Sequence, residues 1–347
     1  METIGAGGGS IAYVDSGGML QVGPRSAGAD PGPACYDRGG LDATVSDANL
    51  VLGRLQSDSV LAGGLNLSAA RAQASIEPLA QRIGLSIEET ALGIIAIANE
   101  HMAKAIRLIS VNKGHDPSGF TLASFGGAGG LHVCALADAM AMKKALVPIH
   151  GGVLSALGMV VADQGRQFSK TLSLDVQQID EQSLEEQFAQ LELGGMEQLA
   201  LEGLDSSALV SKRSADFRYK GQSYTLNIDW HALAEMLDAF EQLHRQRYGY
   251  SHDAPIELLT IRVNLSTAKT PFALPPLVTG GDCNNIRYCK VYGELEQAKL
   301  LARADLYPGE SIEGPAIITE YSATTFVATN WSVAVDGFGN LVLHKLS

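Results

Sequence analysis

Basic residues are scarce in this sequence. Its 347 residues include 25 Lys and Arg against 38 Asp and Glu, which gives a formal net charge of −13 at pH 7. Nucleic-acid binding needs clustered Lys and Arg to meet the phosphates, so this balance argues against nucleic acid as a main partner. It does not exclude a nucleotide, because backbone N–H groups and helix N-termini can hold phosphate without net positive charge.

Cysteine and long apolar runs are also in short supply. The chain has four cysteines, and none forms a C-x-x-C pair; they are Cys35, Cys134, Cys283 and Cys289. Neither a zinc site nor a redox pair is therefore indicated, and free thiols in a reducing cytoplasm are expected. No apolar run reaches about 18 residues and no secretory segment opens the chain, so we expect a cytoplasmic protein without a membrane partner.

Several catalytic patterns are missing as well. The eight histidines are scattered, with no H-x-H, H-E-x-x-H or Cys/His cluster, so no metal site of the chain's own is predicted. This argues against the metal-dependent cyclic amidases, which need dense His and Asp ligation. No G-x-S-x-G elbow occurs either, which argues against an acyl-serine hydrolase.

What is abundant is glycine, with 38 residues, in a chain that is 46% hydrophobic. Strand and helix patterns alternate up to about residue 165, with glycine-rich turns between them, and this predicts a mostly parallel α/β layer. The strongest helix is expected over 86–110, where Glu89 follows Ser86 at the spacing of a capping box. A second helix is expected over 68–84.

The character of the sequence changes after residue 165. An acidic amphipathic helix near 181–203 is followed by a hairpin, a helix near 231–248 and an alternating strand at 256–266. The C-terminal end of the chain resembles a series of short β-strands. We therefore expect an α/β protein in two parts, with an α+β C-terminal domain; the parts are residues 1–165 and residues 166–347, with a linker near 270–285.

Two glycine loops are the main candidate sites. The first contains Gly7, Gly8, Gly9 and Ser10, and we interpret it as a backbone nest for phosphate or substrate. The alternative is a plain glycine hairpin, which would be costly in chain entropy. A strand rather than a helix follows this loop, so it is not a Rossmann fingerprint, and no P-loop occurs.

The second loop lies between a short apolar strand at 120–125 and a helix expected near 131–142. It contains Gly126, Gly127, Ala128 and Gly129. Without side chains it would let a flat ring lie against the backbone, and the following helix N-terminus favours anions. The alternative is a close-packed turn. His132, just after this loop, is expected to be structural.

One charged stripe accompanies these loops. Glu100, Lys104 and Arg107 share a face of the helix over 86–110. Lys104 and Arg107 are candidate ribose or phosphate ligands, and the alternative, which the pattern favours, is an exposed ion-pair face.

A family resemblance rests on a set of segments that cover nearly the whole chain in order. They are Thr3 to Ala12, Val22 to Tyr36 with Gly39-Gly40, Thr44 to Leu55, Phe125 to His132, Pro148 to Gly158, Phe217 to Gln222, His244 to Tyr248 and Gly314 to Glu320. These segments resemble the hydantoinase A/5-oxoprolinase group, which includes N-methylhydantoinase A and the acetone carboxylase beta subunit.

The resemblance implies a fold and a function. It implies part of an actin-like (ribonuclease H-like) ATPase domain over residues 1–165, in which Gly126 to Gly129 would match the adenosine loop. It also implies an ATP-binding, A-type subunit, working with Mg²⁺ and a B-type subunit or domain, that opens hydantoin or 5-oxoproline-like lactams by phosphorylating the amide oxygen. The alternatives are a non-catalytic nucleotide- or partner-binding module and a subunit of an ATP-dependent ketone carboxylase.

The sequence departs from the family pattern in two ways. Gly130 stands where the family commonly has Pro, and the Asp-Gly-Gly-Thr phosphate loops expected upstream of Thr3 do not occur in the chain. We therefore expect a fragment that lacks the family's N-terminal region and the ligands of Mg²⁺ and of the β- and γ-phosphates, and that is inactive alone. The catalytic residues, the lactam and any homo-oligomer are left open.

Overall fold

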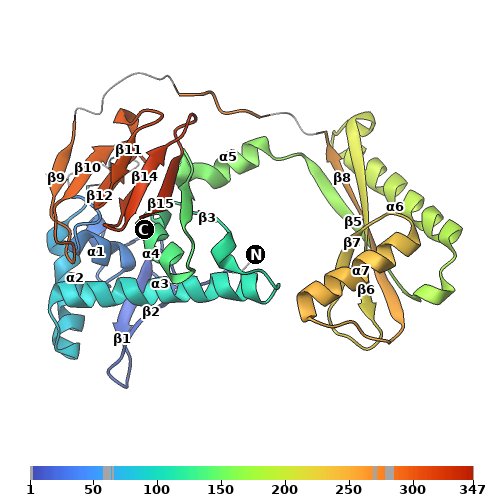
Figure 1. Ribbon diagram of the computed structural model, residues 1–347, viewed down its shortest axis with the longest axis horizontal. Helices are drawn as coiled ribbons and strands as arrows, with labels where there is room; N and C mark the ends of the chain where they lie inside the picture. The colour runs from blue at the N-terminus through green and yellow to red at the C-terminus, as the bar shows by residue number, and fades with distance from the viewer. Residues whose placement is uncertain (1–2, 58–63, 65, 269–271, 278–284, 347) are drawn as a thin grey trace. The chain divides into compact units, whose positions relative to one another are not determined.

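The structure is a computed structural model that describes residues 3–57, 64, 66–268, 272–277 and 285–346. The chain forms two units, each with its own core (Figure 1); the first is Met1–Leu157 with Leu274–Ser347, and the second is Gly158–Ala273.

Two helices of the first unit, α2 and α3, begin at the caps that the sequence predicts. The capping box of Ser86 and Glu89 is formed at the start of the longest helix, and Ser68 caps the helix before it by accepting from the Arg71 N–H. The helices are α1 (Val45–Val51), α2 (Ala69–Ile83), α3 (Ile87–Val111) and α4 (Gly129–Ala139), and α5 (Leu154–Val161) crosses the boundary between the units.

Three sheets complete the first unit. The hairpin β1 (Ser10–Val14) with β2 (Leu20–Ser26) packs on α3. A five-stranded sheet has the order β11-β14-β15-β4-β3 and a four-stranded sheet has the order β13-β12-β10-β9. Their strands are β3 (Leu122–Ala123), β4 (Lys144–Val147), β9 (Arg287–Cys289), β10 (Ala298–Ala302), β11 (Ser311–Glu313), β12 (Ala316–Thr319), β13 (Thr324–Val327), β14 (Trp331–Val335) and β15 (Leu341–Lys345).

The expected parallel layer is wrong in detail. Within the five-stranded and four-stranded sheets, only the pairs β3–β4 and β10–β12 are parallel among the described strands, and the other pairs are antiparallel. The reason is that the part before residue 165 supplies two short strands, β3 and β4, to these sheets. The C-terminal strands complete them, mostly through short antiparallel connections.

The division at residue 165 also differs from the observed one. Strand β15 pairs with β4, so that Leu341 lies opposite Val147, and the final strands belong to the first unit. Trp331 is fully buried in the same core as α4, and its indole N–H donates to Asp138 at 3.3 Å. Apolar burial against α4 therefore holds the strands from β10 to β15 in the first unit, rather than in one domain with the strands β5 to β8.

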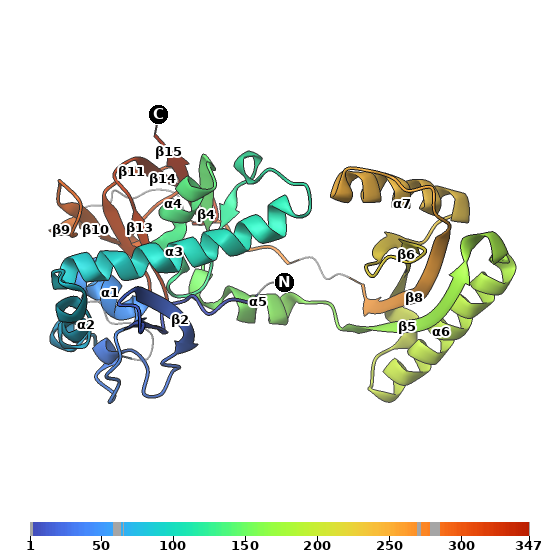
Figure 2. The ribbon, with the colours of Figure 1, turned by 90° about the horizontal axis from the view of Figure 1, so that it is seen from below.

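The second unit places two helices with one four-stranded antiparallel sheet, in the order β5-β8-β6-β7 (Figure 2). Its elements are β5 (Gly165–Asp175), α6 (Glu181–Leu201), β6 (Leu209–Tyr219), β7 (Leu226–Asp229), α7 (Leu233–Tyr248) and β8 (Ile256–Thr267). Phe188 of α6, Phe217 of β6 and Phe240 of α7 are fully buried in a single core. The hairpin and helices expected between 181 and 266 are thus confirmed.

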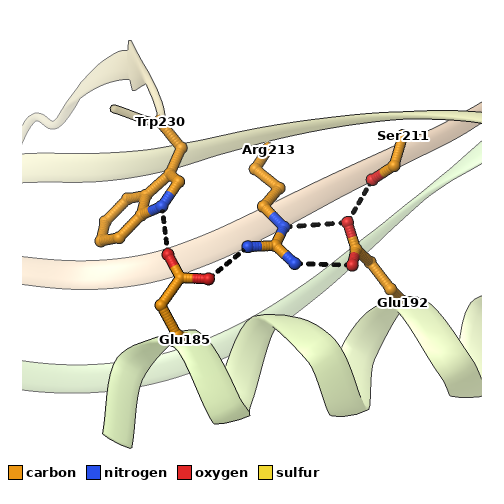
Figure 3. Close-up of polar contacts among 5 residues, drawn as sticks. All are labelled: Glu185, Glu192, Ser211, Arg213 and Trp230. Atoms are coloured by element: carbon orange, nitrogen blue, oxygen red, sulfur yellow. Dashed lines mark hydrogen bonds and ion pairs between the residues drawn. The ribbon is translucent and has the colours of Figure 1, made fainter. Parts of the chain in front are cut away.

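A polar cluster joins α6 to this sheet (Figure 3). Arg213 on β6 donates from Nε and Nη2 to the two oxygens of Glu192, at 2.8 and 2.7 Å, and from Nη1 to Glu185 at 2.6 Å. Ser211 donates to Glu192 and Trp230 donates to Glu185, so both carboxylates have further partners.

Candidate functional site

The two glycine loops meet. Gly8 and Gly9 of the first loop and Gly127 and Ala128 of the second line one cavity of about 270 Å³ in the first unit. A Cβ added at Gly8 would lie 2.8 Å from Ser46 Oγ and 3.6 Å from the Cβ of Ala128. Glycine is therefore required for the close approach of the loop to its neighbours.

The first loop is held by its last residue. Ser10 accepts from the Gly7 N–H through Oγ at 2.9 Å and donates to the Gly5 carbonyl at 3.1 Å. Ser10 is 4% exposed and, with Gly7, is not among the residues that line the cavity. Gly7 and Ser10 thus shape the loop, while Gly8 and Gly9 face the space it borders.

The second loop is fixed by backbone contacts. Gly126 has φ +92°, which favours glycine, and its N–H donates to the Gly151 carbonyl at 2.8 Å. Gly129 begins α4. A Cβ on Gly130 would lie 2.7 Å from the Thr324 carbonyl oxygen, so α4 starts directly against β13.

The side chains around the cavity are uncharged. Tyr36, Ser46, Ser322 and Thr324 are the hydroxyl residues in its lining, and no Asp, Glu, Lys or Arg lines it among the residues that the structure describes. Burial raises the pKa of Tyr36 above its usual value, so this hydroxyl is neutral and can donate at pH 7. Hydroxyl and backbone groups of this kind can orient a bound ligand by hydrogen bonds.

Sequence patterns missed these four hydroxyl residues. Tyr36 and Ser46 lie inside segments that carry the family resemblance, next to a buried carboxylate that organises them. Asp47 accepts from the Cys35 N–H at 2.6 Å and from the Thr44 N–H at 2.8 Å, in a capping box at the start of α1. The Thr-x-x-Asp spacing was the available signal for this box.

The predicted cations lie elsewhere. Lys104 and Arg107 line a different cavity of about 730 Å³, together with Gly5 and residues of the β1–β2 hairpin. Arg107 is paired with Glu100 at 3.3 Å and donates to the Ala139 carbonyl at 3.0 Å. Neither cation lines the glycine cavity, so the structure does not bring these residues together with the loops.

His132 is buried beneath the second loop. It is 3% exposed, and its Nδ1 is 2.7 Å from Asn99 Oδ1, which can only accept. Burial and the positive charge of Arg54 lower the pKa of His132 to about 4, so the ring is neutral at pH 7. This placement agrees with a structural role.

Neither a metal-ligand cluster nor a membrane-spanning helix occurs among the described residues. No group of three or more His, Cys, Asp or Glu side chains in the described ranges could hold a metal ion. Among the same residues, no helix is both long enough and apolar enough to cross a membrane.

The chain is thus an α/β protein whose two glycine loops border one cavity. Residues 1–167 match the family described as Hydantoinase/oxoprolinase. The chain belongs to this hydantoinase/oxoprolinase family.

Three relatives extend the match along the chain. An uncharacterised protein of Methanocaldococcus jannaschii is 39% identical over 99% of this chain and 51% of its own length. The caprolactamase subunit alpha of Pseudomonas jessenii is 33% identical over 97% of this chain and 51% of its own. The acetophenone carboxylase gamma subunit of Aromatoleum aromaticum is 30% identical over 100% of this chain and 51% of its own length.

A solved structure agrees with these matches. The crystal structure of the ATP-dependent caprolactamase from Pseudomonas jessenii has a TM-score of 0.82 and is 33% identical, and the match covers 99% of this chain and 52% of that one. The chain thus spans about half the length of these relatives.

Proposed function

We propose that this chain is the ATP-binding, A-type part of an ATP-dependent hydrolase that opens cyclic amides. The observation that carries this proposal is the meeting of Gly8 and Gly9 with Gly127 and Ala128 around one uncharged cavity. Its volume of about 270 Å³ lies near the lower end of small-molecule pockets, which run from about 300 to 1,000 Å³. We assign to it the nucleoside portion of ATP.

Residues 1–165 would then form part of an actin-like ATPase domain, with Gly126 to Gly129 on the adenosine side. An unstrained lactam is a poor electrophile, and transfer of the γ-phosphoryl group of ATP to the amide oxygen supplies a leaving group before water attacks. Catalysis of such a step consists mostly of positioning and charge neutralisation. The relative from Pseudomonas jessenii is described as an ATP-dependent caprolactamase, which supports this chemistry.

The phosphate side of the site would come from outside this sequence. The residues lining the glycine cavity offer no carboxylate for Mg²⁺, and the 347 residues contain no Asp-Gly-Gly-Thr loop. We propose that these groups, and a B-type subunit that completes hydrolysis, complement the chain. The purified chain with ATP and Mg²⁺ should therefore show no turnover of its own, and clear phosphate release would contradict this.

Nucleotide binding can be tested within one loop. In Gly8→Val the new side chain would enter the space between Ser46 and Ala128, and we expect affinity for adenosine or ATP to fall at least about tenfold, measured by isothermal titration calorimetry. Gly7→Ala is the matched control, because a Cβ there meets nothing within 4 Å. Equal binding by both variants would place the nucleotide elsewhere.

A ketone carboxylase subunit is the second candidate. The match to the acetophenone carboxylase gamma subunit covers 100% of this chain, which favours this reading. A non-catalytic nucleotide- or partner-binding module is the third. ATP consumption by the chain plus a B-type partner, measured with a set of lactams and ketones, separates the three candidates. Consumption that depends on a lactam supports the hydrolase, and consumption that depends on a ketone and bicarbonate supports the carboxylase. Nucleotide binding without ATP consumption supports the non-catalytic module.

A further inference from the structure

The cavity of about 730 Å³ beside the β1–β2 hairpin is separate from the glycine cavity, because none of the described residues lines both. One of its walls is a face of α3. His101, Lys104, Leu108 and Val111 line it at intervals of three or four residues, which places their side chains along one side of the helix.

The opposite wall is fixed by close backbone packing. Tyr13 and Gln21 line the cavity from the hairpin, and Gly5 lines it from the segment before β1. A Cβ added at Gly23 would lie 2.1 Å from the Gly5 carbonyl oxygen, and one added at Gly5 would lie 2.5 Å from Pro24 Cα. The two segments therefore touch through their backbones, and the chain alone forms this wall.

Apolar side chains of the cavity remain in contact with solvent. Ile4, Leu108 and Val111 line it and are 38%, 49% and 56% exposed. The volume of the cavity lies within the range of about 300 to 1,000 Å³ that is typical of small-molecule sites. Covering this surface would remove apolar area from water, so a ligand with a hydrocarbon body is favoured.

The charges at the cavity are of one sign. Lys104 and Arg107 line it, and no Asp or Glu does so among the described residues, although the chain has a net charge of −13. Arg107 is already paired with Glu100 and donates to the Ala139 carbonyl. Within the part of the chain that the structure describes, Lys104 has no hydrogen bond or ion pair, so its charge is the one that a ligand would neutralise.

We propose that this cavity binds a small apolar monocarboxylate, with its carboxylate at Lys104 and its hydrocarbon body against Leu108 and Val111. One carboxylate matches the single uncompensated charge, whereas a phosphate group, at about −1.5 to −2, would exceed it. His101 provides a ring N–H donor on the same face of α3, one turn before Lys104.

The test uses octanoate, octanol and octylamine, which share one hydrocarbon chain and differ in charge. Each is titrated into the whole chain at pH 7 and followed by ligand-observed NMR. Octanoate should bind at least about tenfold more tightly than octanol, and octylamine should bind most weakly, because only octanoate pairs with the ammonium group. High salt should narrow the difference, because the lysine is exposed. Equal binding of octanoate and octanol, or no binding of octanoate, would overturn the proposal.

Variants of Lys104 locate the carboxylate. Lys104→Met keeps an apolar stem, so octanoate affinity should fall at least about tenfold while octanol affinity stays the same. Lys113→Met is the matched control, because Lys113 is exposed and does not line the cavity. Lys104→Glu should bind octylamine more tightly than octanoate, a gain that a merely damaged fold would not give. Unchanged octanoate binding in Lys104→Met would overturn the location.

Two further titrations separate this cavity from the proposed nucleotide and lactam sites. 5-Oxoproline carries its carboxylate on a compact polar ring and should not displace octanoate; displacement at equal concentration would overturn the proposal. Lys104 does not line the glycine cavity, so Lys104→Met should bind ATP as the unaltered chain does. Absence of ATP binding by the unaltered chain, with octanoate binding intact, would count against the proposed function alone.

Discussion

Removing Arg213 should destabilise the second unit markedly. Arg213 holds Glu192 by two hydrogen bonds, and the side chains of this pair are only 24% and 16% exposed. Arg213→Met keeps an apolar stem and removes the guanidinium, whose Cζ lies 5.2 Å from the centroid of the Phe188 ring. Glu192 is then left partly buried with Ser211 as its partner.

The magnitude follows from burial. Breaking a fully buried ion pair costs about 3–5 kcal/mol, whereas an exposed pair is worth about 0–1 kcal/mol. The Arg213–Glu192 pair lies nearer the buried limit, and the Arg213–Glu185 pair, in which Glu185 is 52% exposed, adds little. We expect Arg213→Met to lower the free energy of unfolding by about 2–3 kcal/mol at pH 7.

The pH dependence gives a second signature. The hydrogen bonds from Arg213 hold the pKa of Glu192 below its ordinary value of about 4.3. The stability that Glu192 contributes is therefore present above about pH 4.3 and is lost as the pH falls through its lowered folded-state pKa. The difference between Arg213→Met and the unaltered chain should shrink below about pH 4.

The assay is urea unfolding of the whole chain, followed by the fluorescence of Trp230, in the second unit, and Trp331, in the first. Arg166→Met is the matched control, because its pair with Glu202 is 46% and 42% exposed, and it should cost less than about 0.5 kcal/mol. Equal losses for the two variants, or a difference that does not narrow in acid, would refute the reasoning.

Two further predictions concern the first unit. Gly130→Ala should lower the free energy of unfolding, measured in urea, by about 1–2 kcal/mol. The added Cβ would lie 2.7 Å from the Thr324 carbonyl oxygen and 2.6 Å from Thr325 Oγ1, and this overpacking outweighs the higher helix propensity of Ala. An unchanged or raised stability would contradict this prediction. Burial raises the pKa of Cys35 and raises that of Cys134 to about 12. Both thiols should therefore resist alkylation by iodoacetamide at pH 8 until the chain unfolds, which peptide mass spectrometry can measure. Rapid labelling of the folded chain would count against this prediction.

Local signals were sufficient for the longest helix and for the two loops, although α1 was not among the expected helices. The cap at Ser86 and the apolar spacing that follows it lie within a few residues of each other, so α3 could be predicted within about one residue at each end. The glycine loops are likewise visible in the local composition. The sequence could also mark Lys104 and Arg107 as one helix face, and the ion pair of Arg107 with Glu100 agrees with the reading that the pattern favoured.

Long-range pairing was beyond those signals. Ser322 and Thr324 reach the glycine cavity because β12 and β13 pair beside α4, although both strands lie far from α4 along the chain. Short alternating strands near the C-terminus indicate a sheet without saying which strand each one joins. The same ambiguity led to the expectation that the C-terminal strands belong to one domain with residue 166 onward, whereas they belong to the first unit.

The turn between β12 and β13 explains why the first unit must be built from both ends of the sequence. Ser322 and Thr324 line the glycine cavity from this turn, and the other described residues that line it lie between Gly8 and Leu131. The Glu320 N–H donates to the Ala323 carbonyl at 3.0 Å, so the turn is held by its own backbone. Residues from both parts of the sequence are therefore needed to enclose this cavity.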